Sequence, residues 1–258
     1  MELIQPGAIY TLWLREMIRF ARSKSRIAGN FTMPFLWLVV MGTGLGASIQ
    51  SAGGTSYLSF IGPGVIGMSI LFSSIFSGVS VIWDRQFGFM KEILVTPVSR
   101  VSIVIGKIAG SATISLVNGM VVLLLTLLVG AVPLSTLTAG HMLVALAFMA
   151  LIASAVVSIG LIIASLLNNT EGFQLIMNLL VMPLFFISGA VFPMDKVPDW
   201  MKTISLIDPL MYGVDGLRGI LLGASRFPFL LDLAVLGAFC AAMVAIATYT
   251  FSKMKATT

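Results

Sequence analysis

The chain has 258 residues, of which 58% are hydrophobic and only 10% are charged. Soluble domains carry roughly 25% charged residues, so this chain lacks the polar side chains that a water-facing surface needs, and its mean hydropathy of +1.06 agrees. Its net charge of +5 does not indicate nucleic-acid binding, because the basic residues flank apolar runs, where lipid headgroups would lie. Composition therefore favours an integral membrane protein with no nucleic-acid partner.

The N-terminal segment is predicted to form an amphipathic helix over residues 8–26. Basic residues recur there every three or four positions, so that they form one stripe opposite an apolar face. Such a helix lies in the membrane interface. It could serve as an anchor alone or also dock a partner. The stripe consists of Arg15, Arg19, Arg22 and Arg26.

Six apolar segments follow, each long enough to cross about 30 Å of hydrocarbon as a helix. Prolines inside several of them are tolerated where neighbouring helices satisfy the freed backbone groups. The expected fold class is an all-α integral membrane protein with six transmembrane helices in a single domain, residues 1–258. The segments are Phe31–Ile49, Leu58–Ile82, Val101–Val132, Gly140–Leu167, Phe173–Phe192 and Pro228–Phe251.

Lysine and arginine predict the orientation of these spans. The N-terminal segment, the connection after the second span and the C-terminus are basic, whereas the first and third connections carry no charge. The fifth connection carries aspartates that balance its basic residues. The positive-inside rule then places both termini in the cytoplasm of a multi-pass protein of the cell membrane, and six spans satisfy that parity.

The connection after the second span, residues 84–100, is longer than most links between packed helices. Phe89, Met90, Ile93 and Leu94 would share one face of a short helix that ends before Pro97. An apolar face on a cytoplasmic loop needs a cover. Either a partner protein supplies it, or the helix lies flat on lipid.

Polar stripes at helical spacing run along the second and third spans. Small polar residues let membrane helices pack closely, and the alternative is that they line a translocation path. The candidates for that path are Ser69, Phe72, Ser73, Phe76 and Ser77 on the second span and Ser111, Ser115 and Asn118 on the third.

Residues 193–223, between the fifth and sixth spans, are predicted to form outer re-entrant half-helices too short to cross the membrane. Pro198-Asp199-Trp200 indicates one helix start, and Asp208-Pro209 indicates another, with an N-cap and a proline at the first helical position. Asp215 and Arg218 lie three residues apart, so they can pair on one helix face.

The residues that usually perform catalysis or bind metals are scarce in this chain. It has one histidine and one cysteine, so neither a metal site nor a histidine relay is expected. Gly106-Lys107 does not form a phosphate-binding loop, because Val101 and Ile108 stand where that loop needs glycine and serine or threonine. We therefore expect no enzyme activity and no bound cofactor or metal in this chain.

Titratable groups are almost absent from the predicted spans. Asp232 and Glu171 sit near segment ends. Ion-driven transporters need such groups inside the membrane, so the energy for any transport is expected to come from a partner protein.

Residues 84–100 resemble the cytoplasmic signature of ABC-2 type exporter permeases, with Asp84-Arg85-Gln86-Phe87-Gly88 at the start and Thr96-Pro97-Val98-Ser99-Arg100 at the end. Asn169-Thr170-Glu171 and Asp215-Gly216-Leu217-Arg218-Gly219 are similar to further motifs of that family. The likeness is greatest to the daunorubicin-resistance and nodulation-type permeases. It identifies residues 1–258 as one ABC-2 type transmembrane domain.

That resemblance implies a homodimer with two copies of a separate ABC ATPase, which would bind ATP and magnesium. Residues 84–100 would be the coupling helix that contacts the ATPase, the N-terminal helix would form a second contact, and Asp215 and Arg218 would belong to an outer gate. The coupling residues would be Asp84, Arg85, Phe87, Gly88, Phe89, Glu92, Thr96, Pro97 and Arg100.

The expected function is therefore that of the membrane subunit of an ATP-driven exporter. Drug, lipid and glycan exporters share these motifs, and the serines, methionines and phenylalanines of the spans favour an amphipathic or lipid-like substrate. Two alternatives remain: a channel or scaffold, and a lipid-modifying membrane protein, both without ATP coupling.

Overall fold

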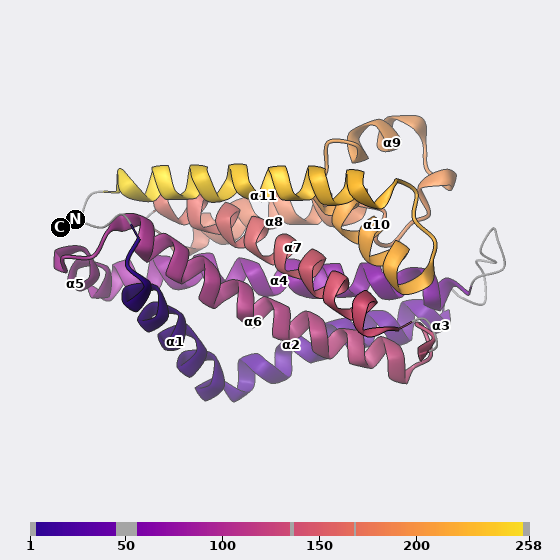
Figure 1. Ribbon diagram of the computed structural model, residues 1–258, viewed down its shortest axis with the longest axis horizontal. Helices are drawn as coiled ribbons and strands as arrows, with labels where there is room; N and C mark the ends of the chain where they lie inside the picture. The colour runs from indigo at the N-terminus through magenta and orange to yellow at the C-terminus, as the bar shows by residue number, and fades with distance from the viewer. Residues whose placement is uncertain (1–3, 45–55, 135–136, 168, 255–258) are drawn as a thin grey trace.

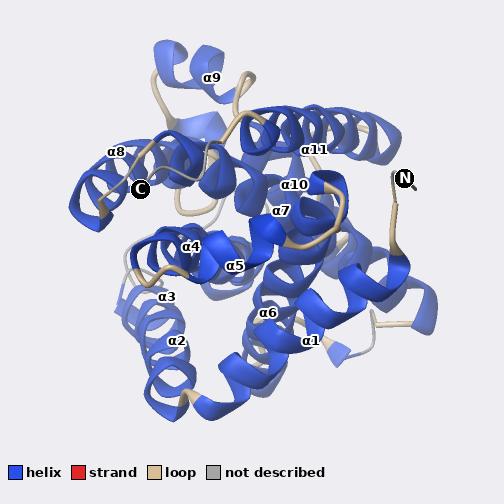
Figure 2. Ribbon diagram, turned by 90° about the vertical axis from the view of Figure 1, so that its left-hand side faces the viewer, coloured by secondary structure: helices blue, strands red, loops and turns tan. Residues whose placement is uncertain are grey.

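The computed structural model describes residues 4–44, 56–134, 137–167 and 169–254, and all regular structure within them is helical (Figure 2). Within these ranges, five helices are long and apolar enough to cross a membrane. The predicted all-α, multi-pass class is thus confirmed, with five of the six expected spans. They are α4 (Tyr57–Gln86), α6 (Arg100–Leu128), α7 (Ala139–Leu166), α8 (Thr170–Ile187) and α11 (Phe229–Ser252).

Helix α4 lies at the centre of the bundle and packs against α6, α7, α8 and α10 (Pro209–Leu222). Of the residues in its most apolar stretch, 94% are buried within the protein. In the corresponding stretch of α11, the share is 17%. Glycines permit this close packing: a Cβ at Gly78 would lie 2.9 Å from the carbonyl oxygen of Gly160 in α7. The lipid-facing surface is therefore left to peripheral helices such as α8 and α11.

The N-terminal region forms two helices where one was expected. Helix α1 (Pro6–Arg22) ends at Ser23, where ψ is 74° and the helical hydrogen-bond pattern breaks, and α2 (Lys24–Leu36) begins directly afterwards. The prediction of one helix over residues 8–26 is therefore wrong, because Arg26 belongs to α2. The side chain of Arg26 lies outside the described part of the chain.

The first expected span, Phe31–Ile49, is an interrupted helical run as far as it is described. Helix α2 passes into a π-helical segment, η1 (Trp37–Met41), and then into α3 (Gly42–Gly44), while residues 45–55 lie outside the described ranges. Pro34 provides a physical reason for the irregularity, because its ring displaces a backbone carbonyl and it has no N–H to donate. Its apolar part, Thr32–Gly44, is shorter than the five long apolar helices.

The loop after α4 contains the short helix predicted from its apolar pattern. Helix α5 (Phe89–Val95) follows Gly88, whose φ of +78° lies in the left-handed region that glycine adopts readily. The helix ends at Thr96, immediately before Pro97. The expected helix in residues 84–100 is confirmed.

Both predicted helix starts in the segment 193–223 are present. A 3₁₀ turn, η3 (Met194–Lys196), leads into α9 (Asp199–Ser205), and α10 begins with the carboxylate of Asp208 accepting a hydrogen bond of 2.9 Å from the backbone N–H of Leu210. Pro209 occupies the first helical position, as expected.

The described ends of the chain lie at the same end of the bundle as α5 (Figure 1). Near the N-terminus, the backbone N–H of Gln5 donates to Ser102 at the start of α6 over 2.8 Å. At the other end of the chain, Arg100 donates to the carbonyl of Met254, just after α11, over 3.1 Å. Both ends are therefore held to the base of α6.

Candidate functional site: a buried charge cluster beside helix α5

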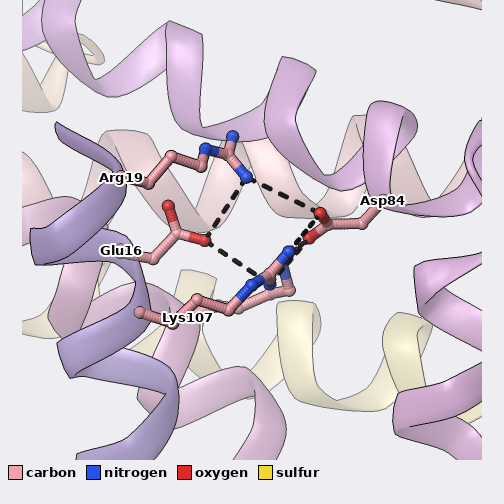
Figure 3. A network of polar contacts seen from close by, with 5 residues as sticks. Glu16, Arg19, Asp84 and Lys107 are labelled. Carbon is pink, nitrogen blue, oxygen red and sulfur yellow. Dashed lines mark hydrogen bonds and ion pairs between the residues drawn. The ribbon is translucent and has the colours of Figure 1, made fainter. Parts of the chain in front are cut away.

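A cluster of charged side chains lies where α1, α4 and α6 meet (Figure 3). Asp84 of α4 is at its centre: Lys107 Nζ of α6 donates to Oδ2 over 2.5 Å, and Arg15 Nη2 of α1 donates to Oδ1 over 2.7 Å. Arg19 Nη1 lies 3.6 Å from Asp84 Oδ1 and 3.9 Å from Glu16 Oε1. We call Arg15, Glu16, Arg19, Asp84 and Lys107 the Asp84 cluster.

Most of the Asp84 cluster is shielded from solvent. Asp84 is 5% exposed and Lys107 is 2% exposed, whereas the side chains of Arg15 and Arg19 keep 28% and 32% of their surface accessible. Taking a charge out of water is so costly that each buried charge depends on its partners. The three cations and two carboxylates therefore hold α1, α4 and α6 in one arrangement.

Close backbone packing brings α1 to this position on α6. A Cβ at Gly106 would lie 2.9 Å from Leu12, and a Cβ at Gly110 would lie 2.9 Å from Glu16, so only glycine leaves room for α1 at these two places. One turn further, the indole N–H of Trp13 donates to Thr113 over 3.1 Å. Helix α1 thus packs on α6, which turns Arg15 and Arg19 inwards to Asp84.

Helix α5 contacts the cluster through an aromatic ring. The guanidinium carbon of Arg15 lies 3.8 Å from the centre of the Phe89 ring, which is cation–π geometry. One turn later, Ile93 is 8% exposed and belongs to the core. One face of α5 is therefore anchored to the bundle beside the Asp84 cluster.

Several described side chains of the 84–100 loop face outwards. Phe87 and Val95 are each 82% exposed, and Glu92, Thr96 and Pro97 are exposed as well. Two large apolar side chains therefore lie uncovered at the tip of this loop, as expected for a surface that a partner covers.

Two arginines of the loop bind the C-terminal ends of further helices. Arg85 Nη1 donates to the carbonyl of Leu167, the C-cap of α7, over 3.0 Å, and Arg100 donates to Met254 beyond α11. Arginine is well suited to helix C-termini, where carbonyl groups lack intrahelical partners. The loop is thus connected to five helices: α1, α4, α6, α7 and α11.

The structure corrects the expectation that the spans hold almost no titratable groups. Lys107 and Asp84 lie inside the spanning helices α6 and α4 and are buried together. The sequence-based site also omitted Glu16 and Lys107. A lysine within an otherwise apolar span was the signal that could have found the cluster, because such a charge needs a partner.

The polar stripes of the second and third spans meet inside the protein. Asn118 Nδ2 donates to Ser73 Oγ over 2.6 Å, and Ser115 lies within hydrogen-bond distance of Ser73 and Ser74. Ser69 and Ser111 are buried along the same helices. These contacts join α4 to α6, so a translocation path along them, which stays a prediction, would require the two helices to separate.

The other three members of the proposed path are Phe72, Phe76 and Ser77. Phe72 packs edge-on against Phe185 of α8, with ring centres 6.5 Å apart. The side chains of Phe76 and Ser77 lie outside the described part of the chain.

Asp215 and Arg218, the expected outer gate, have separate partners. The Asp215 carboxylate accepts hydrogen bonds of 2.8 and 2.9 Å from the backbone N–H groups of Arg226 and Phe227. Arg218 donates to the carbonyl of Gly189 over 3.0 Å and lies over the ring of Phe60. The two described side chains therefore form no ion pair with each other, and each holds α10 to a different neighbouring segment.

Comparison with known proteins shows the family of this chain. The family model described as "ABC-2 type transporter" matches residues 7–222. Nodulation protein J of Rhizobium leguminosarum bv. trifolii is 28% identical over 215 residues, which covers 82% of this chain and 80% of that protein. Transport permease ycf38 of Pyropia yezoensis is 30% identical over 220 residues, 81% of this chain and 72% of that protein. This chain belongs to the ABC-2 type transporter family and is a membrane transport subunit, not an enzyme.

Proposed function

We propose that this chain is the membrane subunit of an ATP-driven exporter and that α5 is the helix on which a separate ABC ATPase acts. The contact between Arg15 and Phe89 carries the proposal, because it joins an outward-facing loop helix to the Asp84 cluster. The family implies an ATPase partner. ATP and magnesium would be bound by that partner.

The packing suggests how a push on α5 would reach the far end of the protein. Helix α4 begins in contact with the segment after α8 and carries Asp84 in its last turn, and its 30 residues span roughly 45 Å at about 1.5 Å each. Because Asp84 ties α4 to α1 and α6, displacement of α5 would move these helices together. Gly64 against Ala190 and Gly67 against Val214 would pass that movement to the outer segments.

We also propose that the run from α2 to α3 is the sixth span. It leads from the C-terminal end of α1 towards Leu58, near the start of α4, where Gly42 packs. With the described chain ends on one side (Figure 1), an even number of crossings is required. Both termini would then be cytoplasmic, and α9 with α10 would form the outer half-helices, α10 re-entering the membrane.

The rest of the assembly follows from the family and the composition. We propose a homodimer with two ATPase copies in the cell membrane, in which α10, with Asp215 and Arg218, gates the exit. The apolar surface and the serine-rich packing favour an amphipathic or lipid-like substrate.

The test of coupling is Glu92→Ala in the complex reconstituted with its ATPase. Glu92 is exposed on α5 and its carboxylate is available to a partner. We expect export to fall at least tenfold while the protein still inserts and ATP hydrolysis continues. The control is Lys253→Ala, which removes an exposed charge at the same end of the bundle but away from α5. Wild-type export by the Glu92 variant would overturn the role of α5.

The orientation can be tested with single cysteines in a Cys240→Ser background. Thr203 is exposed on α9, and Gln86 is exposed at the end of α4 beside α5. An impermeant maleimide added to intact cells should label Thr203→Cys and leave Gln86→Cys unlabelled until the cells are opened. Labelling of Gln86→Cys from outside would invert the proposed topology.

A further inference from the structure

A cavity of about 270 Å³ lies between α7, α10 and α11, at the end of the bundle opposite α5. Its wall is mostly apolar, with backbone surface at Gly216 and Gly219. Three of its lining residues have polar side chains: Asp232 of α11, His141 of α7 and Ser225 of the loop before α11. His141 also interacts with other residues of the protein. The apolar lining consists of Val144, Ile220 and Phe229.

Asp232 is the unexplained group in this cavity. It is fully buried, yet neither of its carboxylate oxygens accepts a hydrogen bond from any described residue. It lies in the first turn of α11, where the helix dipole favours a negative charge. That effect is small compared with the desolvation of a fully buried carboxylate, so Asp232 lacks a counter-ion.

The nearby charges do not supply one. Arg218 donates to backbone carbonyls of Gly189 and Phe60, and Arg226 lies over the ring of Phe227. No described lysine or arginine forms an ion pair with Asp232. Asp215 is close enough to act on Asp232 electrostatically and adds a second negative charge. The cavity thus has a carboxylate without a described lysine or arginine partner on a mostly apolar wall.

We propose that this cavity binds the primary ammonium group of an amphipathic molecule, with Asp232 as its counter-ion. An ammonium donates up to three hydrogen bonds, and the Phe229 ring in the wall adds a favourable surface for a cation. The apolar lining would accommodate the adjoining carbon atoms. The cavity is several times larger than a water molecule, which occupies about 30 Å³, so a headgroup-sized ligand fits.

The lining favours an organic cation over a metal ion. Calcium takes six to eight oxygen ligands, whereas Asp232 and Ser225 are the oxygen-bearing side chains of the cavity wall. Within the described residues, no three His, Cys, Asp or Glu side chains gather as a metal site would require. A single carboxylate among apolar groups matches one ammonium charge.

Two sources could deliver this ammonium. One is a lipid with an amine headgroup in the surrounding leaflet, and the other is a transported amphipathic amine. The second source rests on the proposed function, whereas the first requires only the cavity. The test therefore measures binding directly and does not depend on export.

The experiment uses the purified full-length chain in detergent, with bound lipid counted by native mass spectrometry. We expect phosphatidylethanolamine to bind at least tenfold more tightly than phosphatidylglycerol with the same acyl chains, or dodecylamine to bind in preference to dodecanol. Asp232→Asn should abolish the preference, while Asp199→Asn, an exposed aspartate on α9, should retain it. Val144→Trp, which fills the cavity and keeps the carboxylate, should also abolish it.

The outcomes distinguish a lipid-headgroup site from a site for a free amphipathic amine. A preference for the phospholipid indicates a headgroup site, and a preference for dodecylamine alone indicates a site for a free amphipathic amine. Both support the proposal if Asp232→Asn removes the preference. Equal binding of amine and non-amine ligands, or a preference that Asp232→Asn keeps, overturns it. Failure of the Glu92 test leaves this result unaffected.

Discussion

Asp84→Asn is expected to destabilise the protein by about 3–5 kcal/mol, because it leaves Lys107 buried without a charged partner. Arg15 and Arg19 would lose the same carboxylate, leaving Glu16 as the one anion of the cluster. We expect a large fall in the unfolding temperature and in the amount of protein in the membrane. Unfolding can be followed with a thiol-reactive dye, since Cys240 is buried in the folded chain.

The double variant Asp84→Asn with Lys107→Met separates stability from coupling. It removes both buried charges together, and replacing a buried ion pair by uncharged side chains of similar size is often neutral. We expect stability to recover while export in the complex stays low, because α4 and α6 have lost their electrostatic link. Asp199→Asn, on an exposed pair with Lys202, is the control and should change little. Full export by the double variant would reduce the cluster to a structural role.

Gly64→Ala is expected to have the second largest effect. A Cβ there would collide with the backbone of Ala190, whose carbonyl oxygen, carbonyl carbon and Cα all lie within 3 Å of it. Backbone cannot rotate away as a side chain can, so α4 and the 188–191 segment must move apart. We expect a loss of about 1–3 kcal/mol, the usual cost of overpacking.

That displacement would reach two further contacts. The same segment provides the carbonyl of Gly189 to Arg218 and the carbonyl of Val191 to the hydroxyl of Tyr57. Gly237→Ala in α11 is the matched control, since nothing lies within 4 Å of its Cβ and alanine favours a helix. The dye assay should show a lower unfolding temperature for Gly64→Ala and an unchanged or higher one for Gly237→Ala. Equal unfolding temperatures for the two variants would show that the 188–191 segment can move away from α4 without loss of stability.

The sequence by itself determined those features whose physical cause is local. The length of each apolar run is set by the thickness of the membrane, so five spans could be placed close to their observed ends. The ends of α5 and α10 could be predicted because Pro97 cannot continue a helix and Asp208-Pro209 satisfies the first turn of one. The family could also be recognised from the 84–100 motif, because the residues of that motif are consecutive in the sequence.

The tertiary structure decided which charges meet. Asp84, Arg15 and Lys107 come from three segments, and helical periodicity gives the face of each residue but not the neighbour that this face contacts. The spacing of Asp215 and Arg218 permitted an ion pair between them, but the Asp215 carboxylate instead accepts a hydrogen bond from the backbone of a later loop. The partner of a charge is whichever group the packing brings within hydrogen-bond distance, and packing depends on the whole chain, through glycines such as Gly106 and Gly110 that let α1 approach α6.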